Sequence, residues 1–392
     1  MATLLLIFCY IIFIGLGIPD SLLGASWPMA HLDIGARLDF ANFITILLSL
    51  FTMISSFFSA RIVNKFGMGV VVFISTFLTA VGLIGFSVSN SIWWFCLFSI
   101  PSGLGAGGID ATLNNFIAVR YKASFMSFSH CFYGVGVALS PYIMSFALKS
   151  GSWRLGYRAT FFVQIFITII SIIAIPLWKK VKPLDSQEEE IEPITLSYKQ
   201  MYKTPAVKSA WLTFFSTCGL EFTCGIWACT FLVYQGMSAD VAAKFLTLYY
   251  IGMTSGRILS GIVATKLSPE KIVAVGYCIV GMGLIAMLLP LPITLKGFAL
   301  LLVGLGNGPS FPNLTYITPK LFGKEKSQSL IGSWLVVANA GILLLPALFG
   351  LLANSISPSL LPIYLFVLFA LMCVSTVNYI ATAKKHRTIV NK

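Results

Sequence analysis

Charge is scarce in this sequence: only 10% of its 392 residues are aspartate, glutamate, lysine or arginine, and three more are histidine. An ordinary soluble domain carries about 25% charged residues. Hydrophobic residues instead make up 57% of the chain, and its mean hydropathy is +0.90. So few charges could not keep a folded body of this length in solution, and the sequence therefore predicts an integral membrane protein.

Several signatures of catalysis and ligand binding are also missing. The sequence has no Gly-x-x-x-x-Gly-Lys-Ser/Thr phosphate loop, which excludes ATP-driven transport by this chain. Its eight cysteines lie in apolar runs without histidines at metal-ligand spacing, so we expect packing residues, no metal and no cofactor. The net charge of +13 is spread over short loops and forms no dense basic patch, which argues against nucleic acid as a partner.

Long apolar runs dominate what is present. A helix needs about 20 apolar residues to cross the hydrocarbon core of a bilayer, and twelve stretches are long enough. They are too continuous for the alternating strands of a transmembrane barrel, which are about ten residues long. The sequence therefore predicts an all-α membrane protein whose twelve transmembrane helices cover residues 4–30, 39–60, 69–89, 92–119, 126–149, 158–178, 209–235, 241–264, 272–291, 297–319, 328–353 and 360–382.

The basic residues predict the orientation in the membrane. If the N-terminus is cytoplasmic, twenty of the 26 lysine and arginine residues lie on the inner side. Because cytoplasmic loops carry the excess of positive charge, both termini are expected inside, in a multi-pass protein of the cell's inner (plasma) membrane. Arg257 lies near the inner end of its predicted helix, and we expect its side chain to extend to the inner surface.

One connection is longer and more polar than the others. Residues 179–208 contain lysines at both ends and an acidic run between them, as expected of a solvated linker. This segment divides the twelve helices into six and six. We therefore predict an N-terminal bundle over residues 1–180, a cytoplasmic linker over 181–208 and a C-terminal bundle over 209–392.

The two predicted bundles share a residue register. Acidic, basic and glycine positions of the first half recur 201 positions later, and Pro141 recurs as Pro346 after a loop that is four residues longer. A parallel duplication of this kind is used by transporters that bind their solute between the halves. The matching pairs are Asp20 and Glu221, Gly24 and Gly225, Lys65 and Lys266, Gly103 and Gly304, Gly105 and Gly306, and Gly107 and Gly308.

The turn after the second predicted helix resembles a signature of the major facilitator superfamily. It reads Ala60-x-x-x-Asn64-Lys65-x-Gly67, similar to that family's Gly-x-x-x-Asp-Arg-x-Gly, with alanine for glycine and asparagine for aspartate. A more degraded copy follows the eighth helix. This resemblance implies the major facilitator fold, with two pseudo-symmetric six-helix bundles.

A second resemblance, to the fucose–proton symporter (fucose permease-like) group, covers most of the chain. It rests on Gly-Ile-Pro-Asp-Ser-Leu-Leu-Gly at residues 17–24, Gly-Ala-Gly-Gly-Ile-Asp at 105–110 with the two asparagines that follow, and Ser-His-Cys-Phe-Tyr-Gly-Val-Gly at 129–136. In that group an acid in helix 1 and an acid in helix 4 serve sugar binding and proton coupling, which implies these roles for Asp20 and Asp110. The sequence departs from the group by carrying Asp110 for glutamate, a histidine at 130 for an amide and Glu221 for glutamine, so the resemblance implies a sugar without specifying fucose.

Ionisable residues inside the predicted helices are exceptional. Each costs about 3 kcal/mol or more at the centre of a bilayer, and such residues mark functional sites. Asp20, Asp110, Glu221 and His130 lie well inside their helices. A carboxyl group that can be either charged or neutral as water access changes is what proton coupling requires. We predict Asp110 as the proton carrier, helped by Asp20 or Glu221.

Polar and aromatic side chains around these acids form the predicted solute site. Carboxylates and amides bind hydroxyl groups, and an indole face covers the apolar side of a sugar ring. Taken singly, the tryptophans are better explained by packing, Asn307 and Gln164 by bonding a neighbouring helix, and His130 or Asp20 equally well by a structural role. The predicted binding residues are Asp20, Asn114, Asn115, His130, Tyr133, Gln164, Glu221, Trp227, Asn307 and Trp334.

Together these features favour a secondary active transporter that takes up a monosaccharide or similar small polar solute with protons by alternating access. Sodium is the alternative coupling ion. Proton-coupled efflux of drugs or metabolites is the nearest rival, although the fifth helix matches only two of five positions of an exporter-type Gly-x-x-x-Gly-Pro-x-x-Gly-Gly segment. A membrane receptor without transport would need a soluble signalling segment, and an enzyme would need a second substrate site. We expect neither a receptor nor an enzyme. The expected partners are the solute and the lipid bilayer. The expected oligomeric state is a monomer.

Overall fold

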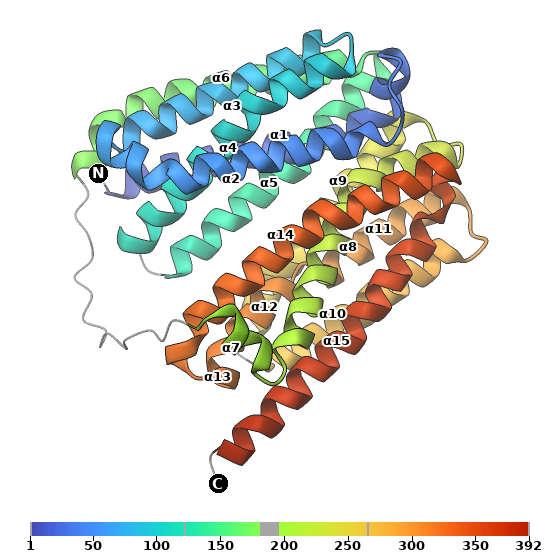
Figure 1. Cartoon of the computed structure of the whole chain (residues 1–392). Coiled ribbons are helices and arrows are strands. Elements are labelled where there is room, and N and C mark those ends of the chain that lie inside the picture. The colour runs from blue at the N-terminus through green and yellow to red at the C-terminus, as the bar shows by residue number, and fades with distance from the viewer. Residues whose placement is uncertain (1, 121–122, 181–195, 265, 391–392) are drawn as a thin grey trace. The chain divides into compact units, whose positions relative to one another are not determined.

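The computed structural model describes residues 2–120, 123–180, 196–264 and 266–390, and the regular elements among them are helices (Figure 1). By their internal contacts the residues fall into two compact units. The first unit comprises Met1–Ser186 with Cys229–Tyr250, and the second comprises Gln187–Ala228 with Ile251–Lys392. Helices α8 (Val207–Tyr234) and α9 (Ala239–Val263) therefore each contribute residues to both units.

The first unit is built on pairs of long helices. Helix α1 packs along α5, α2 and α3 both pack along α4, and α3 also packs along α6. An apolar cluster centred on Phe13, Phe116 and Ile167 is buried among them. These helices are α1 (Ala2–Asp33), α2 (Phe40–Phe66), α3 (Met68–Val88), α4 (Ile92–Arg120), α5 (Ala123–Lys149) and α6 (Trp153–Ala174), followed by the 3-10 turn η1 (Ile175–Lys180).

The second unit has its own aromatic core. Phe214 of α8 stacks on Trp334 with ring centroids 5.5 Å apart, and Tyr379 closes the cluster at 6.2 Å from Trp334. Burying rings of this size supplies much of the packing energy of such a bundle. The remaining helices are α7 (Tyr198–Lys203), α10 (Pro269–Leu288), α11 (Ile293–Asn307), α12 (Ser310–Tyr316), α13 (Thr318–Phe322), α14 (Lys324–Ser355) and α15 (Leu361–Val390), with the 3-10 turn η2 (Pro358–Leu360) before α15.

The helices confirm the all-α membrane fold predicted from the apolar runs. Each of the twelve predicted spans coincides with one helix, or with consecutive helical segments, among the described residues. Ten of these helices are long and apolar enough to cross a membrane. The other two spans are α9, which carries Asp240, Lys244 and Arg257, and α11, which has 15 residues. Of the predicted linker, residues 181–195 lie outside the described part of the chain.

The tenth span is interrupted because of two prolines. Pro309 has no N–H for the carbonyl of Leu305, and Pro312 has none for the carbonyl of Gly308. Helix α11 accordingly ends at Asn307, and α12 begins at Ser310. A membrane-spanning helix tolerates such a break where other groups bind the freed carbonyls.

Helix contacts repeat between the two units at the offset seen in the sequence. A Cβ atom on Gly107 would collide with the carbonyl oxygen of Thr52, and one on Gly308 would collide with that of Met253. Both members of the second pair lie 201 positions after those of the first. In each unit, therefore, a glycine brings two helices to backbone contact in the same register, as expected of a duplicated bundle.

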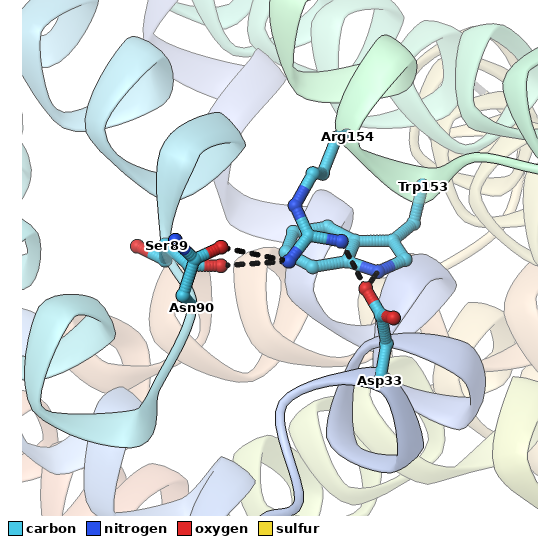
Figure 2. A network of polar contacts seen from close by, with 5 residues as sticks. All are labelled: Asp33, Ser89, Asn90, Trp153 and Arg154. Carbon is cyan, nitrogen blue, oxygen red and sulfur yellow. Dashed lines mark hydrogen bonds and ion pairs between the residues drawn. The ribbon is translucent and has the colours of Figure 1, made fainter.

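A polar network joins three helix ends of the first unit (Figure 2). The Arg154 guanidinium at the start of α6 donates to the Asp33 carboxylate at the end of α1, to the Ser89 carbonyl oxygen at 3.0 Å and to Asn90 Oδ1 at 3.3 Å. Trp153 Nε1 donates to Asp33 Oδ2 at 3.0 Å, and the guanidinium carbon lies 4.3 Å from the centroid of that indole. The network fixes the ends of α1 and α6 against the turn between α3 and α4.

Candidate functional site

Asp20 is an exposed acid in the middle of an apolar helix. Its neighbours Ile18, Ser21 and Leu22 are at most 1% exposed, whereas the Asp20 side chain is exposed. Tyr133 of α5 donates a hydrogen bond from its hydroxyl to Asp20 Oδ2. The predicted acid of helix 1 therefore has a phenol as its partner.

A glycine on α1 explains why the tyrosine reaches the acid. A Cβ atom on Gly17 would collide with the carbonyl oxygen of Tyr133, and one on Gly136 would collide with that of Ile14. At these two glycines the backbones of α1 and α5 are therefore in direct contact. Asp20 lies one turn from Gly17, so its carboxylate faces the hydroxyl of the adjoining tyrosine.

Asp110 and Asn114 lie one turn apart on α4. Asn114 Nδ2 donates to Asp110 Oδ1 at 2.7 Å, and both side chains are half-buried. Asn114 Oδ1 is buried and has no hydrogen-bond partner among the described residues. Asp20 of the same unit is likewise bound by a neutral group, the Tyr133 hydroxyl. This group combines two carboxyl groups with neutral hydrogen-bonding partners.

The acid of the second unit is paired with a cation. Arg257 Nη2 on α9 lies 3.1 Å from Glu221 Oε1 on α8, and the two side chains are 26% and 16% exposed. Arg257 Nε also donates to the Gly308 carbonyl oxygen at 3.4 Å, which is the carbonyl that Pro312 deprives of a helical donor. Arg257 therefore neutralises Glu221 and binds a freed backbone group at the same time.

The expectation that Arg257 extends to the inner surface is wrong. Its guanidinium turns instead toward Glu221 and Gly308, because an intramembrane cation is stabilised by a carboxylate and a free carbonyl. In the first unit Ser56, 201 positions earlier, donates to the Gly107 carbonyl at 3.2 Å. The two units thus repeat a side-chain hydrogen bond to the equivalent glycine carbonyl, but the donor is a neutral serine in the first unit and a charged arginine in the second.

Sequence reasoning missed this ion pair, although a signal for it was present. An arginine inside an apolar helix requires a counter-ion, and Glu221 is the acid that lies inside a predicted span of the same half. The prolines at 309 and 312 also marked where a backbone carbonyl would need a donor.

His130 and Asn115 complete the predicted positions of the first unit. The His130 side chain is exposed, and its ring is tilted by 56° against Phe13 with centroids 6.1 Å apart. The side chain of Asn115 lies outside the described part of the structure.

The two predicted tryptophans are buried within the packing of their helices. Trp227 Nε1 donates to the Pro346 carbonyl at 3.0 Å, and Trp334 Nε1 donates to Thr318 Oγ1 at 3.1 Å. Both indoles are 0% exposed. Neither presents a free face to a solute here, so packing explains their positions.

The other two predicted amides, Gln164 and Asn307, are also buried, but they differ in their partners. Gln164 is 0% exposed, and its Nε2 donates to Thr79 Oγ1 at 2.6 Å, which ties α6 to α3. Asn307 is 1% exposed, and neither of its amide atoms has a hydrogen-bond partner among the described residues. The hydroxyl of Ser310, three positions later, is likewise without one. The interrupted helix thus carries polar groups that remain available for a ligand or water.

The sequence matches a known protein family and is similar to two proteins of known name. Residues 4–346 match the Major Facilitator Superfamily. The chain is 25% identical over 426 residues to Bypass of stop codon protein 6 of Saccharomyces cerevisiae, covering 98% of this chain and 84% of the yeast protein. It is 24% identical over 284 residues to the 3-(3-hydroxy-phenyl)propionate transporter of Escherichia coli, covering 69% of this chain and 68% of that protein.

Solved structures show the same fold at low sequence identity. A D-xylose–proton symporter superposes with a TM-score of 0.74 at 12% identity, covering 96% of this chain and 97% of the symporter. An inward-facing bacterial homolog of the human lysosomal transporter Spinster superposes with a TM-score of 0.72 at 12% identity, covering 97% of this chain and 96% of that one.

Proposed function

Since this chain belongs to the Major Facilitator Superfamily, we propose that it is a secondary active transporter that takes up a monosaccharide or similar small polar solute together with protons. The similarity to the fucose–proton symporter group at residues 17–24, 105–110 and 129–136 supports a sugar. Alternating access would expose the site to each side of the membrane in turn.

The observation that carries this proposal is the difference between the acids of the two units. Asp20 is bound by a tyrosine hydroxyl and Asp110 by an asparagine amide, and no lysine or arginine pairs with either among the described residues. Glu221, in contrast, forms an ion pair with Arg257. A carboxyl group without a fixed cation can exchange its charge for a proton at low cost, whereas one inside an ion pair cannot.

The proposal gives each group a role. Asp110 carries the proton, and Asn114 holds its carboxyl in place. Asp20 and Tyr133 bind hydroxyl groups of the solute, joined by His130 and Asn115. In the second unit, Glu221, Arg257 and Asn307 provide an acceptor, a donor and an amide for binding a polar solute. Gln164, Trp227 and Trp334 support these residues through packing and internal hydrogen bonds.

A second candidate solute is a small organic anion. Arg257 is a cation inside the apolar part of the chain, and the relative in E. coli is named as a transporter of an aromatic propionate. Guanidinium binds carboxylates through two parallel hydrogen bonds, so a solute carboxylate could compete with Glu221 for it. The pairing of Arg257 with Glu221 leaves this site without net charge and favours the neutral solute.

Transport by purified protein in proteoliposomes tests the function. An inward proton gradient of one pH unit is expected to drive accumulation of a labelled monosaccharide up to about tenfold if one proton moves with each solute. A protonophore should abolish that accumulation, and a sodium gradient should not replace the proton gradient. Counterflow with a panel of sugars and of aromatic acids would identify the solute class. Proton-driven extrusion of the solute, or accumulation driven by sodium alone, would contradict the proposal.

A further inference from the structure

A groove lies on the first unit between α2 and α3. Both helices pack along α4 far more than on each other, which leaves a cavity of about 540 Å³ above α4. Its floor includes Leu104 and Gly108, and its walls include Phe58 of α2 with Ile74 of α3. Phe58 and Ile74 are 41% and 45% exposed, so the groove is open. A surface of this kind takes an apolar occupant.

Two basic side chains stand at one end of the groove. Arg61 and Lys65 line it from the last turns of α2, and both are exposed. The Arg61 guanidinium carbon lies 5.8 Å from the ring centroid of Phe58, and Lys65 Nζ lies 5.3 Å from that of Phe66. Cation–π contacts of this length hold both charges beside the apolar walls.

These two charges have no acidic partner in the part of the chain that the structure describes. Neither Arg61 nor Lys65 forms an ion pair with an acid among the described residues. The turn carries Asn64 where the resembling family signature has an aspartate. The residue that could have balanced the positive charge is therefore an amide in this chain.

We propose that this groove binds a phospholipid, with an acyl chain along α2 and α3 and an anionic headgroup on Arg61 and Lys65. A free anion would match the two cations but would leave the apolar walls uncovered, and a neutral lipid would leave the charges unpaired. An anionic lipid covers the apolar walls and also pairs with the two charges, because basic side chains next to apolar helices attract acidic headgroups. The residues that line the groove include neither Asp20 nor Asp110.

The second unit provides a matched comparison. Lys266 occupies the position of Lys65, 201 residues later, and is also exposed. Ile262 replaces Arg61 at the same offset, so the corresponding place has one basic side chain instead of two. Lys266→Gln therefore removes an equivalent lysine without touching the proposed site.

Native mass spectrometry of the delipidated full-length protein tests the headgroup. Phosphatidylglycerol and phosphatidylcholine with identical acyl chains are titrated against wild type, Arg61→Gln, Lys65→Gln, the double variant and Lys266→Gln. If each basic group contributes as it does at an anionic membrane surface, the double variant should bind the first phosphatidylglycerol about 30-fold more weakly. Each single variant should lose about fivefold, and Lys266→Gln should bind like wild type. Equal loss in Lys266→Gln, or no loss in the double variant, would overturn the proposal.

A second pair of variants tests the acyl chain. Ile74→Trp places bulk in the groove and should weaken phosphatidylglycerol binding, whereas Phe77→Trp, on an exposed position of α3 outside the groove, should not. Soluble glycerol phosphate should fail to compete, because it has a phosphate but no acyl chain. Competition by glycerol phosphate, or unchanged binding by Ile74→Trp, would show that the groove does not hold the lipid chain. Circular dichroism checks that each variant is folded.

Discussion

Asp110→Asn is expected to abolish uphill accumulation of the solute while leaving exchange of internal for external solute intact. Asparagine keeps the size of the side chain and can still bond Asn114, but it cannot bind and release a proton. Uptake would then stop when inside and outside concentrations are equal, in place of the roughly tenfold ratio that one pH unit can support. Labelled solute uptake and counterflow, measured on the same proteoliposomes, separate the two activities.

The matched control is Glu221→Gln. Because Glu221 is paired with Arg257, this glutamate is not expected to carry the proton, and the amide oxygen of the glutamine can still accept a hydrogen bond from the guanidinium. The variant should bind the solute more weakly yet still accumulate it uphill. Uphill accumulation by Asp110→Asn would show that Asp110 is not the proton carrier.

Arg257→Met is expected to cause the largest loss of stability. It removes the cation that pairs with Glu221 and the donor that binds the Gly308 carbonyl. Breaking a buried ion pair from one side costs about 3–5 kcal/mol. Since both side chains retain some exposure, we expect the lower end, which corresponds to a decrease of about 4 °C in Tm for a chain of this length. Thermal unfolding of the purified protein, followed by intrinsic fluorescence, measures it.

A double-mutant cycle tests whether the pair itself is responsible. The variant that combines Glu221→Leu with Arg257→Met removes both charges, and it should recover more than half of the lost stability. Ser56→Ala, which removes the equivalent contact to Gly107 in the first unit, should cost only about 1 kcal/mol because it breaks a neutral hydrogen bond. Additive losses in the double variant would show that the two residues are not energetically coupled.

Much of the fold could be predicted from the sequence because membrane helices are specified by length and apolarity. Residues 39–60 were predicted and α2 covers Phe40–Phe66, and residues 209–235 were predicted and α8 covers Val207–Tyr234. The break in the tenth span was not predicted. It depends on Pro309 and Pro312 removing backbone donors, an effect on hydrogen bonding that hydropathy does not register.

The candidate site could be predicted less completely, because it depends on which helix faces meet. The register marked Asp20 and Glu221 as equivalent, but it could not show that one would bind a tyrosine and the other an arginine. The chemistry of their rings predicts Trp227 and Trp334 as solute ligands, but both indoles are buried in helix packing. The orientation of a side chain around a helix is set by tertiary contacts that a single sequence does not specify.

The number of protons that enter with each solute molecule tests the central claim most directly. It is obtained by recording external pH and labelled uptake together when solute is added to proteoliposomes. A ratio of about one proton per solute is expected in wild type and in Glu221→Gln, and no proton movement is expected in Asp110→Asn. Proton entry that persists in Asp110→Asn, or that disappears in Glu221→Gln, would show that Asp110 is not the residue that couples proton movement to solute transport.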